Sequence, residues 1–239
     1  MNTQLMMESL PSLLQGAWIT LQLLFSSLFF GIILAVPLAL MRISSNPFLS
    51  WPTRAYIYFF RGTPALVQIF LIYYGLAQFG FVRQSFVWPF LRQAYICALF
   101  TLSLHTAAYT AVILRGAIEA VPFGQIEAAR AAGMSRFGTY HRIIFPQALR
   151  LALPAYSNEA ISMMKATSLA STITIMELTG TANTIVSQTF VPYEIFITAA
   201  LIYLSIAYVL SSVISYAEHR LSRHMRPIPV SVVSENGNG

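Results

Sequence analysis

The sequence predicts an all-α transmembrane fold with about five spanning helices. Hydrophobic residues make up 56% of the 239 residues and charged residues 9%, whereas a water-soluble domain carries about 25% charged residues. The apolar residues gather in stretches of about 20, the length that a helix needs to cross about 30 Å of hydrocarbon. Basic residues lie singly between these stretches, which is typical of membrane topology and not of a nucleic-acid-binding surface.

Several apolar stretches meet this length criterion. They cover approximately residues 16–41, 55–81, 94–114, 148–176 and 195–217. The first is predicted to be a retained span, because a signal peptide needs a basic leading region and the preceding segment holds only Glu8 as a charge. We expect one membrane domain of residues 16–226, between a short N-terminal segment of residues 1–15 and a disordered tail of residues 227–239.

The positions of Lys and Arg predict the orientation, because short basic loops stay in the cytoplasm. Placing the N-terminus outside and the C-terminus inside leaves only Arg83 and Arg92 in the outside loops. The short N-terminal segment is then external and the tail cytoplasmic. The loop before the fifth stretch carries Glu177 and Glu194 and no basic residue, which also favours an outside position. We therefore expect a multi-pass protein of the cell inner (plasma) membrane.

The long loop between the third and fourth stretches, at about residues 115–147, is predicted to form two short helices on the cytoplasmic side. Residues 125–132 are rich in strong helix formers, and Gly133 is placed to end that helix in the left-handed conformation. Ser135 can cap a second helix, after which Pro146 would open the fourth span. The first helix is slim because it is rich in alanine, so another protein can approach its backbone closely. The alternative is that this loop only covers the cytoplasmic end of its own helix bundle and binds no other protein.

Two blocks in this loop resemble a known motif. Glu127-Ala128-Ala129, three residues, Gly133, nine residues and Ile143-Ile144-Phe145-Pro146 resemble the EAA motif of ATP-binding-cassette import permeases, E-A-A-x3-G-x9-I-x-L-P. Phe145 replaces the usual Leu, an exchange between large apolar residues. The resemblance implies a coupling helix seated in a cleft of a separate ATPase subunit. The ATPase-coupling residues are then Glu127, Ala128, Ala129, Arg130, Ala132, Gly133, Met134 and Ser135.

A segment of the second stretch narrows the resemblance. Arg61-Gly62-Thr63-Pro64, followed by Val67-Gln68, resembles the R-G-T-P-x-x-V-Q segment of the polar-amino-acid branch of these permeases. This branch includes the importers of histidine, lysine, arginine, ornithine and opines, and the likeness runs through nearly the whole chain. From the residues alone, Gly62 weakens the helix, and Thr63 as an N-cap before Pro64 predicts a break. Arg61 is expected at or within membrane depth, where snorkelling to the interface is the simplest description.

Glu159 and Lys165 fall deep within the predicted fourth span, where charges are costly and usually face a cavity or a partner. They are six residues apart, on different sides of a helix, which excludes an i,i+4 ion pair. Ser162 and Met163 share the face of Glu159, which suits a helix that lines a path or packs closely on a neighbour.

The resemblance also bears on the substrate. In relatives that import basic amino acids, the Asn-Glu pair found here as Asn158-Glu159 is associated with substrate contact, which the resemblance implies for Glu159. With the two residues that share its face, the predicted substrate-binding residues are Glu159, Ser162 and Met163. Pairing of Glu159 with a basic residue of a neighbouring helix is the alternative. Some relatives carry a second acid in a Lys-Asp-Ser-Ser-Leu stretch, where this chain has Ala166. The missing acid favours a heterodimer with a second permease chain over a homodimer.

Sites for catalysis are not apparent in the sequence. It contains neither a G-x-x-x-x-G-K-[ST] motif nor any aspartate, so the chain is not expected to be an enzyme. One cysteine and four scattered histidines offer no metal-ligand spacing. We expect no cofactor on this chain, with ATP and Mg bound by a partner ATPase dimer. The other expected partners are a second permease subunit, an external substrate-binding protein and the lipid bilayer, but not nucleic acid.

These features together predict the permease subunit of an ATP-driven importer of basic amino acids or related opines, which forms half of the translocation path. The alternative is a secondary transporter or channel that works without ATP and uses Glu159 and Lys165 as a proton relay or ion site.

Overall fold

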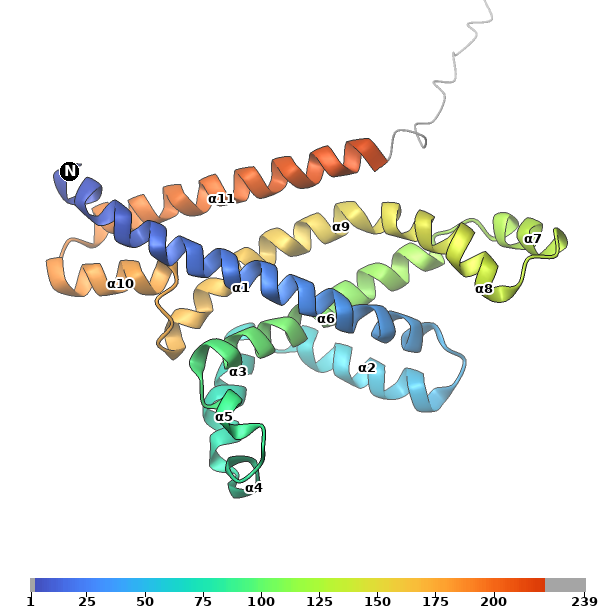
Figure 1. Cartoon of the computed structure of the whole chain (residues 1–239), viewed down its shortest axis with the longest axis horizontal. Helices are drawn as coiled ribbons and strands as arrows, with labels where there is room; N and C mark the ends of the chain where they lie inside the picture. The colour runs from blue at the N-terminus through green and yellow to red at the C-terminus, as the bar shows by residue number, and fades with distance from the viewer. Residues whose placement is uncertain (1–2, 222–239) are drawn as a thin grey trace, which may run out of the picture.

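The structure is a computed structural model that describes residues 3–221, and the regular elements in this range are all helical, as predicted. The three longest helices are α1 (Thr3–Ile43), α6 (Ala94–Glu119) and α11 (Pro192–Leu221). Figure 1 shows α1 running along most of the molecule and crossing α6, against which it packs most extensively. The predicted tail, residues 227–239, lies outside the described residues.

Three helices in this range are long and apolar enough to cross a membrane: Gln4–Ile43, Ala94–Glu119 and Pro192–Arg220. A further pair, Pro47–Gly62 and Ala65–Gln78, meets the same test together and is bent by 109°. The helix α9 (Phe145–Ala166), which carries the charged residues of the predicted fourth span, is not among them. The count of five spans and the orientation therefore stay predictions.

The second predicted span is broken where the sequence indicated. The helix α2 (Pro47–Gly62) ends at Thr63, and α3 (Ala65–Phe70) begins after Pro64. The capping prediction was wrong by one residue, because Thr63 closes α2 instead of opening α3. Its Oγ1 donates back to the carbonyl oxygen of Phe59 at 2.8 Å. Proline restricts the residue before it to extended backbone, so Thr63 leaves the helix with ψ of 145°.

The side chain of Gln68 stabilises this bend. Its Nε2 donates to the carbonyl oxygens of Phe60 and Thr63 at 2.8 and 3.0 Å, and its Oε1 lies 2.9 Å from His105 Nδ1 on α6. Gln68 is 1% exposed. It satisfies carbonyl groups at the end of α2 that would otherwise be buried without partners.

The chain then makes a series of short turns. A π-helical turn (Leu71–Gly75), a 3-10 turn (Leu76–Gln78), α4 (Gly80–Arg83) and α5 (Trp88–Leu91) lead to α6. In Figure 1 this segment projects away from the long helices.

The helix α9 (Phe145–Ala166) ends earlier than the predicted fourth span and continues as a 3-10 turn (Thr167–Ile173). Hydroxyl groups in this turn bond to carbonyl oxygens three residues back, as Thr167 does to Met164 at 2.6 Å, and so favour the tighter winding. Next comes α10 (Leu178–Thr189), a helix that sequence analysis did not predict.

Glu177 opens α10 and is fully buried, although its position between apolar stretches indicated a charge in an outside loop. Its carboxylate accepts hydrogen bonds from the backbone N–H groups of Thr179 (3.0 Å) and Gly180 (2.8 Å). The hydroxyls of Thr20 on α1 (3.3 Å) and Tyr203 on α11 (2.8 Å) also donate to it. Glu177 therefore joins three helices and is a structural group, not a solvated loop charge.

Replacing Glu177 by glutamine is expected to destabilise the fold. The glutamine amide nitrogen cannot accept a hydrogen bond, so at least one buried donor loses its partner, at about 1–3 kcal/mol for each. The midpoint of thermal unfolding of the purified protein in detergent should fall. Glu8→Gln is the matched control, since Glu8 is exposed on α1. An unchanged midpoint for Glu177→Gln would show that the hydrogen bonds of this carboxylate do not stabilise the packing of the three helices.

Candidate functional site

The predicted coupling loop forms one end of the molecule, where Figure 1 places α7 (Phe123–Ala131) and α8 (Arg136–Thr139). The turn between them is a Schellman motif, in which Gly133 N–H donates to Arg130 (2.9 Å) and Met134 N–H to Ala129 (3.0 Å). Gly133 has φ of +78°, which confirms its predicted left-handed conformation. Ser135 caps α8 as predicted, with its Oγ accepting from Gly138 N–H at 3.1 Å.

The second short helix is not separate from the fourth span, contrary to prediction. The helix α8 passes through a π-helical turn (Tyr140–Ile144) directly into α9, so winding is unbroken from Arg136 to Ala166. Pro146 lies in the first turn of α9. Because proline lacks an N–H and its ring displaces the carbonyl one turn back, the wider π turn accommodates it without ending the helix.

Most of the implied coupling residues are accessible. The exposed ones are Glu127, Ala128, Arg130, Ala132, Gly133 and Ser135. Ala129 is buried, and Met134 is half-buried. A hydrogen bond of 2.6 Å from Gln147 Nε2 to Gln125 Oε1 further joins α7 to α9. The loop therefore presents a slim surface to solvent and is attached firmly to the helix behind it.

Glu159 lies on α9 inside the bundle and is 8% exposed. Its Oε1 accepts a hydrogen bond from Thr106 Oγ1 on α6 at 3.0 Å. The residue Gly31 of α1 lies so close to the Thr106 methyl group that any side chain there would collide with it. In the described part of the chain Glu159 forms no ion pair, so the alternative of a basic partner on a neighbouring helix of this chain is not observed.

The structure separates the other predicted substrate residues. Met163 is buried in the core with Glu159 on the same side of α9, whereas Ser162 is exposed and its Oγ donates to Asn158 at 2.9 Å. Lys165 is exposed as well. Glu159 and Met163 therefore face this chain's own helices, and Ser162 and Lys165 face its surroundings.

Sequence analysis missed the polar residues of α6 that surround this position. His105 meets Gln68, Thr106 holds Glu159, and Arg61 lies over the ring of Tyr109 at 5.2 Å from its centroid. These polar residues could have been noticed in the sequence, because they lie together within an apolar stretch. In a membrane-spanning helix, polar side chains usually face the protein interior and not the lipid. In the described residues no group of three or more His, Cys, Asp or Glu could hold a metal ion.

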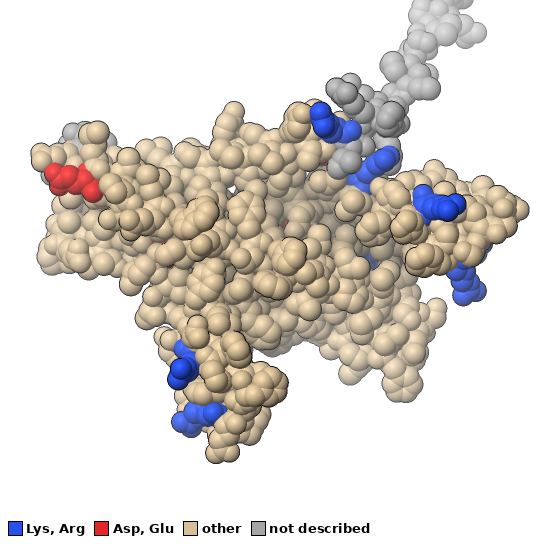
Figure 2. Space-filling model, viewed as in Figure 1, with Lys and Arg blue, Asp and Glu red and all other residues tan. Residues whose placement is uncertain are grey.

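Charged residues gather away from the middle of the molecule. Figure 2 shows Lys and Arg at the end that holds α7, α8 and the C-terminal end of α11, and on the α4–α5 segment. Acidic groups appear at the opposite end, near the start of α1. On the face that Figure 2 shows, the surface between the two ends is nearly free of charge, as a lipid-facing surface requires.

Comparisons with known proteins agree on one family. Residues 27–223 match the model of the binding-protein-dependent transport system inner membrane component. The chain is 52% identical to the nopaline transport system permease protein of Agrobacterium fabrum, over 95% of this chain and 94% of that protein. It is 45% identical to the histidine/lysine/arginine/ornithine transport system permease protein of Escherichia coli, over 89% and 90% of the two chains.

Solved structures extend this likeness to the fold. An amino acid ABC transporter crystallised with histidines matches with a TM-score of 0.81 and 36% identity, over 90% of this chain and 96% of that chain. The MetNI methionine ABC transporter matches with a TM-score of 0.69 at 19% identity, which shows the shared fold alone. The chain is therefore a multi-pass inner membrane protein and belongs to the family of binding-protein-dependent transport system inner membrane components.

Proposed function

We propose that this chain is the permease subunit of an ATP-driven importer of basic amino acids or opines and forms half of the translocation path. The relatives named above are permeases for nopaline and for histidine, lysine, arginine and ornithine. Another, from Rhizobium meliloti, is an octopine permease that is 50% identical. These solutes share a carboxylate and a group that can carry positive charge.

The observation that carries this proposal is the unbroken winding from Arg136 to Ala166. It joins the exposed coupling surface to Glu159 over 23 residues, or about 35 Å at the rise of an α-helix. A helix of this kind moves as one body, so displacement of α7 and α8 by a partner would move Glu159 relative to α6. The geometry thus supports coupling between a soluble motor and an intramembrane carboxylate.

Glu159 supports the cationic substrate class. Its carboxylate is buried, accepts a hydrogen bond from one hydroxyl and forms no ion pair within the described residues, so in its ionised form it would be stabilised by a guanidinium or ammonium group. A single carboxylate can bind the positively charged group of such a solute but not its carboxylate. We therefore infer that a second, different permease chain completes the path.

The remaining partners follow from the same mechanism. An ATPase dimer would bind ATP and Mg, for which this sequence has no phosphate-binding loop motif. An external binding protein would deliver the solute to the side opposite α7 and α8, which are then cytoplasmic.

Reconstitution in sealed vesicles tests the proposal. The chain is co-expressed with the second permease chain and the ATPase and is reconstituted with them. The vesicles are expected to accumulate radiolabelled arginine or octopine only when ATP is on the α7–α8 side and the binding protein is on the other side. Vesicles with an ATPase unable to hydrolyse ATP are the control. Uptake driven by an ion gradient without ATP would instead support a secondary transporter that uses Glu159 and Lys165.

A further inference from the structure

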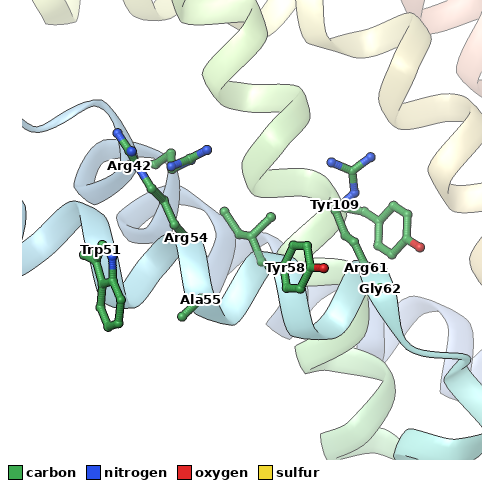
Figure 3. Close-up of a pocket in the computed structure, with 9 residues that line it drawn as sticks. Arg42, Trp51, Arg54, Ala55, Tyr58, Arg61, Gly62 and Tyr109 are labelled. Atoms are coloured by element: carbon green, nitrogen blue, oxygen red, sulfur yellow. The ribbon is translucent and has the colours of Figure 1, made fainter.

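A positively charged pocket of about 690 Å³ lies on the outer side of α2, between the C-terminal end of α1 and α6. Most of the α2 residues that line it lie along one stripe of that helix, namely Trp51, Arg54, Ala55, Tyr58 and Arg61, and Ile57 and Gly62 lie beside this stripe. Arg42 comes from α1 and Tyr109 from α6. Figure 3 shows Arg42 and Arg54 at one end of the pocket and Arg61 beside Tyr109 at the other.

The pocket is lined by basic and not by acidic residues, and the acids that act on its arginines, Glu119 and Glu159, lie outside it. Within residues 3–221 none of its three arginines forms an ion pair, and no acidic residue lines it. Arg42 Nη1 is buried without a hydrogen-bond partner, and the positive charges of Arg54 and Arg115 both act on Arg42. The nearby acid Glu119 is bound to Arg115 at 2.9 Å. Arg42 and Arg54, whose positive charges repel each other, are stabilised when an anion binds between them.

The other side of the pocket is aromatic and open. Trp51 is 72% exposed and Tyr58 83% exposed, and Phe48 extends the same surface at the start of α2. Such side chains sit at membrane interfaces, where one part of the ring meets hydrocarbon and the other meets water. Arg42 ends the longest apolar helix, so the pocket lies where headgroups meet the hydrocarbon.

We propose that this pocket is a binding site for an anionic phospholipid. The phosphate lies between Arg42 and Arg54, whose planar guanidinium groups each present paired donors to phosphate oxygens. The glycerol and upper acyl chains contact Trp51 and Tyr58. Arg61 is seven residues, or about 10 Å, further along α2 and adds positive potential without sharing that phosphate. Inorganic phosphate satisfies the arginines equally but leaves the aromatic side unused, which favours the lipid.

Fluorescence of Trp51 reports occupancy directly. The chain has three tryptophans, so Trp18→Phe and Trp88→Phe leave Trp51 as the single emitter of the full-length protein in mixed detergent micelles. Brominated phosphatidylglycerol is expected to quench Trp51 at a lower mole fraction than brominated phosphatidylcholine. The preference should be about fivefold for each participating arginine, since one basic side chain near an anionic headgroup contributes on the order of 1 kcal/mol.

Matched variants show which arginines cause the preference for phosphatidylglycerol over phosphatidylcholine. The double variant Arg42→Gln/Arg54→Gln should bind the two lipids equally, whereas Arg83→Gln/Arg92→Gln, on the projecting α4–α5 segment, should keep the preference. Arg42→Lys/Arg54→Lys retains charge and should keep part of it. Equal quenching by both lipids in the parent protein would overturn the proposal without recourse to any variant. So would displacement of the brominated lipid by inorganic phosphate at equal concentration, which would show a site for free anions.

Discussion

Gly133→Val is expected to abolish transport while the protein still inserts and folds. At φ of +78° a β-branched side chain strains the backbone by about 1–3 kcal/mol. That strain lowers the ratio of the native turn to its alternatives by roughly 5- to 150-fold. The turn sets the angle between α7 and α8, so its loss would remove the surface that the ATPase is proposed to grip. Uptake by reconstituted vesicles measures the effect, with protein amount checked by blotting.

Two variants separate backbone strain from lost contact at Gly133. A side chain at this position meets nothing within 4 Å in this chain, so Gly133→Asn, which tolerates the left-handed conformation, should retain most of the transport. Gly124→Ala, in the first turn of α7, places a methyl group in open space and should have no effect. Normal uptake by Gly133→Val, or failure of crosslinkers placed along residues 128–135 to capture an ATPase, would refute the coupling role.

Glu159→Gln is expected to lower uptake of arginine about 10- to 150-fold, the equivalent of a hydrogen bond to a charged group worth about 1.5–3 kcal/mol. Glutamine has nearly the same shape, and its amide oxygen can still accept the hydrogen bond from Thr106. The substitution therefore removes the charge and keeps the packing. Initial rates over a range of arginine concentrations, together with basal ATP hydrolysis, measure the change.

The side-chain shape of citrulline matches that of arginine without its charge, which provides the control for Glu159→Gln. If the carboxylate acts on the substrate cation, the variant should lose its ability to distinguish arginine from citrulline, and ATP hydrolysis should change little. Lys165→Gln should leave uptake nearly unchanged, because an ATP-driven importer does not need Lys165 as a proton relay or ion site. Unaltered arginine kinetics in Glu159→Gln would leave the carboxylate a structural role only.

Local signals were enough to predict much of this molecule. The helical class depends on apolar stretches of about 20 residues, and the break at Thr63-Pro64, the left-handed Gly133 and the cap at Ser135 depend on the residue itself and on neighbours within one turn. Proline, glycine and hydroxyl side chains restrict or satisfy the adjacent backbone in the same way in most surroundings. The EAA-like motif was found for the same reason, since its spacing is local.

What only the tertiary structure decided is how distant segments meet. Glu177 reads as a loop charge until Thr20 and Tyr203, more than 150 residues and 26 residues away along the chain, are seen to donate to it. The pairing of Glu159 with Thr106 and the cluster of Arg42, Arg54 and Arg61 arise likewise from separate helices. Helix packing determines which side chains share an interior, and one sequence pattern is compatible with many packings. The sequence by itself therefore determined the helices and the local turns, whereas packing alone decided which charges are buried and which remain open to a partner.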